Sequence, residues 1–79
     1  MLNNIERHTK WTLFYITRAI ESVKQGEDPT IWLANAIKNG ADLGKDYYLN
    51  YMTDAEKDLD FKKIYQKAMV EVEKELKDC

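Results

Sequence analysis

The stretch that decides the fold is residues 3–25, NNIERHTKWTLFYITRAIESVKQ. Its apolar residues recur at the three- and four-residue spacing of one side of an α-helix. An arc of roughly 120° on that helix carries Leu2, Ile5, Thr9, Thr12, Leu13, Ile16, Ala19, Ile20 and Val23. We therefore predict an amphipathic helix over 3–25 with this stripe buried in the core. Asn3 or Asn4 is expected to cap its start, and Gly26 sits where a left-handed residue would end it.

The next segment opens with Glu27-Asp28-Pro29, which favours a new helix start. Asp28 is a good N-cap, and Pro29 suits the first helical position because its missing N–H would be unpaired there. This predicts a second helix over 29–39, whose apolar face is Leu33, Ala34, Ile37 and Ala41.

Residues 42–52 leave two interpretations open. They form either a separate short helix or a continuation of the second helix past Gly40 and Gly44. A break or kink is favoured, since each glycine costs about 1 kcal/mol against alanine in a helix interior.

Thr53-Asp54-Ala55-Glu56 has the pattern of a capping box and predicts a last helix over 54–77. The residues expected on its buried face are Phe61, Ile64, Tyr65, Ala68, Met69, Val72 and Leu76.

The predicted fold is a single all-α domain over 1–79, with three or four helices in a small antiparallel bundle. In the simplest packing, the two long end helices pair antiparallel and the middle segment lies across one side. A chain of 79 residues builds a small core. One cysteine, Cys79, allows no internal disulfide, and one histidine, His8, allows no His/Cys metal cluster within one chain. We therefore expect self-association to complete the bundle.

The first helix is apolar on a second side as well, where Trp11, Phe14 and Tyr15 lie. These rings pack within the chain against Trp32 or Tyr47, form a subunit interface, or line a small-molecule site. The expected interface or ligand-binding residues are Trp11, Phe14, Tyr15, Arg18, Trp32, Lys38, Tyr47 and Tyr51.

Catalytic chemistry is not indicated. Ser22 lies about four turns from His8 on the same predicted helix, so the two cannot meet in one chain. Carboxylates of the last helix alternate with lysines, as on a solvated face. We predict no enzyme activity, catalytic residue, metal or cofactor. The net charge of −2 favours neither extended nucleic acid nor a membrane surface as a partner, and a cytoplasmic location is expected.

The function expected from these features is that of a non-enzymatic helical interaction protein acting as a homo-oligomer, most simply a dimer. Its partners would be a second copy and another protein, as for small regulators, inhibitors or immunity proteins. The alternative is an oligomer that sequesters a small anionic ligand, such as a nucleotide, at a subunit boundary. Trp11, Tyr15 and Arg18, with Lys38 or Lys45, would then stack the ring and neutralise the charge. The size and the lack of chemistry are typical of small phage, plasmid and bacteriocin proteins, although no motif identifies a family.

Overall fold

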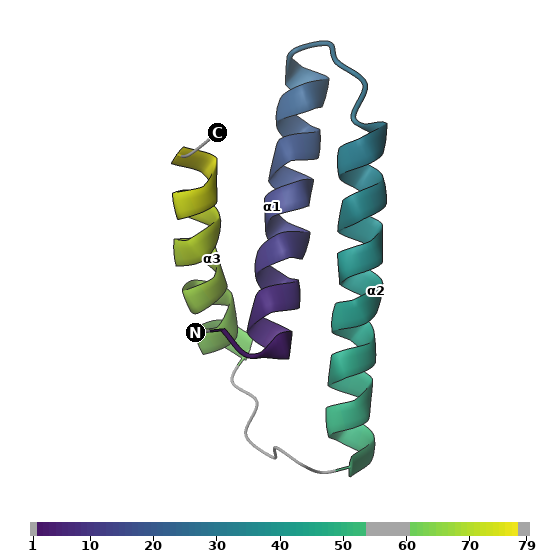
Figure 1. Cartoon of the computed structure of the whole chain (residues 1–79), viewed down its shortest axis with the longest axis vertical. Coiled ribbons are helices and arrows are strands. Elements are labelled where there is room, and N and C mark those ends of the chain that lie inside the picture. Colours follow the sequence, from purple (N-terminus) through teal and green to yellow (C-terminus); the bar gives the residue numbers. More distant parts are fainter. Residues whose placement is uncertain (1, 54–60, 78–79) are drawn as a thin grey trace.

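The computed structural model describes residues 2–53 and 61–77, and the side chains of residues 50–53 and 61 are outside that description. Three helices make up the described part: α1 (Asn4–Lys24), α2 (Thr30–Thr53) and α3 (Phe61–Lys77) (Figure 1). The helices pack against one another and no strand occurs within the described ranges, so the all-helical prediction is confirmed.

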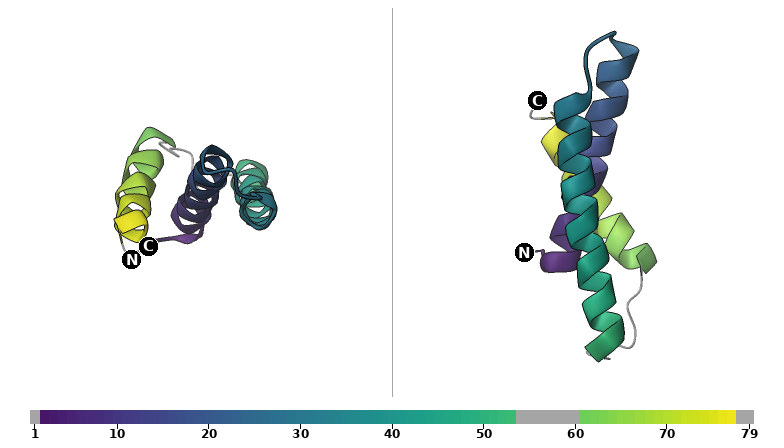
Figure 2. Two further views of the ribbon diagram at one scale, coloured as in Figure 1. Left: turned by 90° about the horizontal axis from the view of Figure 1, so that it is seen from above. Right: turned by 90° about the vertical axis from the view of Figure 1, so that its right-hand side faces the viewer.

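The three helices form a single layer with α1 in the middle. α1 contacts both neighbours, whereas α2 and α3 make no contact with each other within the described residues. Seen from above, the helices stand side by side in the order α3, α1, α2 (Figure 2). The molecule measures 44 × 22 × 17 Å, and its shortest dimension is about one and a half times the ~10–12 Å diameter of one helix. The layer therefore has two broad faces.

Side-chain pairs fix the helix directions. Contacts between α1 and α2 run in opposite order along the two chains, from His8 with Asp46 to Tyr15 with Trp32, so this pair is antiparallel.

Ion pairs between α1 and α3 run in the same order on both helices, from Glu6 with Lys67 to Lys10 with Glu75. α1 and α3 are therefore parallel, and the predicted antiparallel pairing of the two end helices is wrong. The reason is the length of α2, whose 24 residues carry the chain back to the starting end of α1.

The predicted break in the middle segment is also wrong. The spans expected as two helices, 29–39 and 42–52, belong to the single helix α2, which continues through Gly40 and Gly44. Gly40 lies against α1, where a Cβ atom would be 3.8 Å from Thr12 Cγ2. Packing of α2 along α1 compensates for the poor helix propensity of the two glycines. The capping box predicted at 53–56 to open the last helix lies outside the described residues.

The signals predicted for the two ends of α1 and for the start of α2 are confirmed. Asn3 caps α1 in a capping box: its side chain accepts from the Glu6 N–H at 2.8 Å, and its own N–H donates to Glu6 Oε1 at 3.0 Å. Gly26 has φ +75° and follows the end of α1, where the Glu27 N–H donates to the Ser22 carbonyl at 2.8 Å. At the start of α2, Asp28 Oδ1 accepts from the Thr30 N–H at 3.0 Å.

The buried apolar core is small. Among the residues whose burial is described, it comprises Ile5, Phe14, Ala19, Ala36, Ile64, Ala68 and Val72. Three of the seven are alanines, which allow close approach of the helix backbones but contribute little apolar area. α3 buries Ile64, Ala68 and Val72, as predicted, but Tyr65 of the same predicted face is 42% exposed.

The stripe predicted to be the buried side of α1 is buried only in part. Ile5, Thr9 and Ala19 are buried, but Ile16, Ile20 and Val23 are 42%, 51% and 63% exposed. The stripe lies on a broad face of the layer, between the directions of α2 and α3. Because α3 crosses α1 obliquely (Figure 2), the later turns of this stripe stay uncovered.

The predicted apolar face of the second helix is exposed as well, at Leu33, Ala34, Ile37 and Ala41. α2 instead turns Ala36 and the half-buried Gly40 toward α1.

Replacing Gly44 by alanine is expected to stabilise the fold by about 1 kcal/mol, because nothing lies within 4 Å of the added Cβ and α2 gains helix propensity. The melting temperature should rise by roughly 4–8 °C. Gly26→Ala, at positive φ, should instead destabilise by ~1–2 kcal/mol. Urea and thermal unfolding at one protein concentration measure both changes. A destabilised Gly44→Ala variant would contradict the open surroundings of that position.

Candidate functional site

An aromatic ladder, formed by Trp11, Phe14, Tyr15 and Trp32, joins α1 to α2. The Trp11 ring lies 5.4 Å from Phe14 and 6.0 Å from Tyr15 between centroids. Tyr15 in turn lies 6.1 Å from Trp32 on α2. Such spacings fall within the favourable range for aromatic pairs. Of the alternatives open from the sequence, packing within the chain is seen for Tyr15, which reaches Trp32, while Trp11 and Phe14 contact rings of their own helix.

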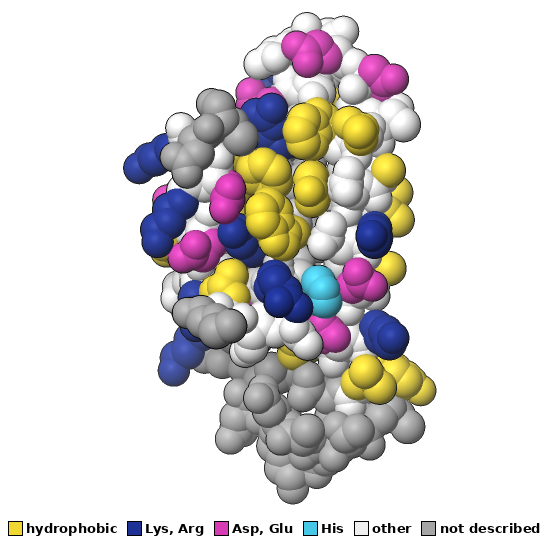
Figure 3. Space-filling model, viewed as in Figure 1, with side chains coloured by type: hydrophobic (Ala, Val, Ile, Leu, Met, Phe, Trp, Pro, Cys, Tyr) yellow, Lys and Arg dark blue, Asp and Glu magenta, His cyan; other side chains and the backbone are white. Residues whose placement is uncertain are grey.

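Two cations lie over the ends of the aromatic ladder. Lys10 Nζ is 4.3 Å from the Trp11 ring centroid, and Arg18 Cζ is 4.8 Å from that of Trp32. Each distance fits a cation–π interaction. Figure 3 looks on to one broad face and shows apolar side chains gathered over α1 and the start of α2, with basic side chains next to them.

Four other residues predicted for this site are not part of the aromatic ladder. Lys38 is exposed, and it lies two residues from the buried Ala36, about 200° around the helix, so it points away from α1. Lys45 is also exposed. Tyr47 is half-buried, and burial raises the pKa of its hydroxyl. Tyr51 belongs to α2, but its side chain is outside the described part.

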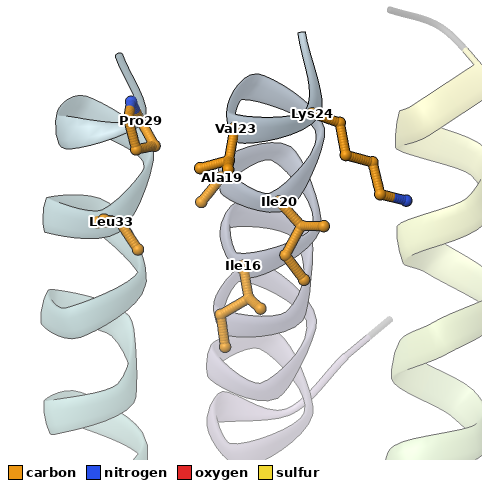
Figure 4. A pocket seen from close by; sticks show the side chains of 7 residues that line it. All are labelled: Ile16, Ala19, Ile20, Val23, Lys24, Pro29 and Leu33. Carbon is orange, nitrogen blue, oxygen red and sulfur yellow. The ribbon is translucent and has the colours of Figure 1, made fainter. Parts of the chain in front are cut away.

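The opposite broad face carries an apolar groove between α1 and α2 (Figure 4). α2 lies to the left and α3 to the right in this view, the reverse of Figure 1, so it looks on to the other side of the layer. The groove has a volume of about 260 Å³, and the apolar residues that line it are Ile16, Ala19, Ile20, Val23, Pro29 and Leu33. Lys24 stands at its rim and points away from α2.

Exposed apolar residues extend this face along α2. Ile37 is 72% exposed, and it lies one turn beyond the groove residue Leu33. Gly44 and the exposed Tyr48 follow on the same side of the helix at similar spacing. The apolar groove is thus part of a longer apolar face.

The sequence contains the signal for the groove, because its α1 residues are the stripe that periodicity assigns to the core. What sequence reasoning missed is that none of the three helices described covers the second half of that stripe.

Ion pairs join α1 and α3 beside the apolar contact of Ile64, Ala68 and Val72. Lys67 Nζ lies 3.1 Å from Glu6 Oε2, and Lys10 Nζ lies 3.0 Å from Glu75 Oε1. Glu6 and Lys10 are both buried. The N–H of Asn3, which donates to Glu6, lowers the pKa of that carboxyl, and Lys67 lowers it further.

No group of three or more His, Cys, Asp or Glu side chains in the described part of the chain is placed to hold a metal ion. Among the same residues, no helix has the length and apolar character needed to cross a membrane.

Comparison with known proteins gives no relative for this chain: no protein-family model, no curated protein and no solved structure matches it.

Stability should depend on pH through Glu6. Because its pKa is lowered in the folded state, its contribution is fully present above the ordinary value of 4.5 and is lost as the pH falls below that value. We expect Glu6→Gln to be less stable than the parent at neutral pH. The difference between their free energies of unfolding, called the gap below, should narrow toward about pH 3. Urea unfolding across this range tests it. A gap that stays constant with pH would show that the charge of Glu6 contributes nothing.

Proposed function

We propose that this protein is a non-enzymatic helical interaction protein that acts as a homo-oligomer, most simply a dimer formed through the face that holds the apolar groove. The observation that carries the proposal is a layer one helix thick with aliphatic side chains open on one face.

Stable domains are built from at least two layers of secondary structure around one core. α1 has helices on two opposite sides, but the face bearing Ile16, Ile20 and Val23 has no second layer within the described residues. A layer of helices from outside the chain would bury that face and give the molecule a two-layer core.

A second copy is the occupant that this face fits best. The groove is lined almost entirely by carbon, and its one charged residue, Lys24, is bent away at the rim. Two copies related by a two-fold axis would therefore meet without placing like charges against each other. The layer extends 44 by 22 Å, enough for the ~800 Å² per partner of a standard interface.

The expected dimer is of moderate strength. Burying the remaining surface of Ile16, Ile20, Val23, Leu33 and Ile37 offers about 1 kcal/mol for each, or about 10 kcal/mol for two copies. Association costs at least ~4 kcal/mol. The surplus is therefore at most about 6 kcal/mol, which corresponds to a Kd of tens of micromolar at the tightest.

The dimer would leave the face with the aromatic ladder outward, available to another protein. Small regulators, inhibitors and immunity proteins act in this way. The second candidate function, sequestration of an anionic ligand at a subunit boundary, has less support at the place expected for it. Arg18 is stacked over Trp32, and Lys38 points away from α1.

The test is a single charged substitution in the groove. Ile20→Glu should weaken the dimer at least ten-fold, because a carboxylate would have to be buried against aliphatic side chains. Sedimentation equilibrium or light scattering on both sides of about 40 µM measures the change.

Val70→Glu is the matched control, since Val70 is 53% exposed against 51% for Ile20 and lies about 180° around α3 from the midpoint of Ala68 and Val72. It should dimerise as the parent does. Circular dichroism confirms that both variants fold. A parent protein that stays strictly monomeric at several hundred micromolar would overturn the proposal.

A further inference from the structure

A second hollow lies between α1 and α3, and the apolar groove does not include it. This α1–α3 cleft has a volume of about 380 Å³ and is lined by Leu2, Arg7, Lys10, Trp11, Lys67 and Glu71. Its size is at the small end of the range for small-molecule sites, with room for one ring system and one acidic group. Trp11 is half-buried and supplies a flat aromatic wall.

Most charges around the cleft are matched. Lys10 is paired with Glu75 at 3.0 Å, and Lys67 with Glu6 at 3.1 Å.

The carboxylate of Glu71, which would repel an anion, accepts from Lys74 at 3.3 Å. Arg7 differs from the other cations of the cleft. Its guanidinium donates to the neutral side-chain oxygen of Asn4 at 2.6 Å, and no carboxylate among the described residues pairs with it. The cleft therefore has a net charge of about one positive unit, centred on Arg7.

We infer that the α1–α3 cleft binds a small aromatic anion, with its ring on Trp11 and its acidic group on Arg7. A guanidinium presents two parallel N–H donors that match a carboxylate or phosphate. An indole face provides stacking for a flat ring. Lys10 Nζ lies over the Trp11 ring, so the ring of the ligand would replace it there, and Lys10 and Lys67 would then add positive potential from the flanks.

The cleft is made by one chain and lies on the Trp11 side of α1. The proposed dimer uses the opposite side. Binding in the cleft thus does not require the dimer, and either proposal can fail while the other holds.

The experiment follows the two tryptophan indole N–H signals by NMR during titration with benzoate and with adenosine monophosphate. Their neutral counterparts, benzamide and adenosine, are titrated in parallel. The signal of Trp11 should move with the anions, and that of Trp32, outside the cleft, should move much less. Benzoate and the nucleotide distinguish a carboxylate from a phosphate as the preferred acidic group.

Arg7→Gln should weaken anion binding about ten-fold, which is the loss of one charge-assisted hydrogen-bond pair. Lys38→Gln, an exposed cation on α2 outside the cleft, is the matched control and should leave binding unchanged.

An unmoved Trp11 signal at millimolar anion would overturn the inference. Equal responses to the neutral compounds, or equal binding by Arg7→Gln, would also overturn it. Light scattering on the same samples reports separately on the dimer.

Discussion

Two neighbouring helices on opposite sides of a third cannot enclose it. α1 contacts α2 along one edge and α3 along the other, and the two outer helices do not meet within the described residues. A closed three-helix bundle would give every helix two neighbours and one common core. Here α1 has two broad faces over which no described helix lies. Only side chains that extend from α1, α2 or α3 can cover these faces.

The two broad faces of α1 are covered to different extents. Trp11 and Tyr15 are long enough to form a ladder of rings that reaches Trp32 on α2, so the aromatic face is partly closed by the chain itself. Ile20 and Val23 are short and branched, and they do not span the groove to α2. Aliphatic surface therefore stays open where aromatic surface does not, although sequence periodicity assigns the aliphatic side to the core.

The features of this fold that depend on residues close together in the sequence were predictable from the sequence. Asn3, Gly26 and Asp28 act through hydrogen bonds or backbone angles within a few positions, and the structure places all three as predicted. Periodicity also grouped the right residues of α1 into two sides, but it gives only their positions around the axis, not which side a neighbour covers. The uninterrupted α2 was missed for a related reason, because the contact of Gly40 with Thr12 is a tertiary contact that propensity does not include.

The ion pairs along α3 select one direction for that helix. In the observed parallel arrangement Glu6 meets Lys67, and Lys10 meets Glu75. Reversing α3 in the same position would bring Glu75 toward Glu6 and Lys67 toward Lys10, so two matched pairs would become two like-charge contacts. Glu6 and Lys10 are buried, but Lys67 and Glu75 are 52% and 40% exposed, so water would screen part of that repulsion and its cost would be moderate. The apolar contact of Ile64, Ala68 and Val72 has no such directionality, since small aliphatic side chains pack nearly as well either way along α1. The charge pattern thus favours the direction of α3 that the length of α2 already sets, while apolar burial provides the attraction between the helices.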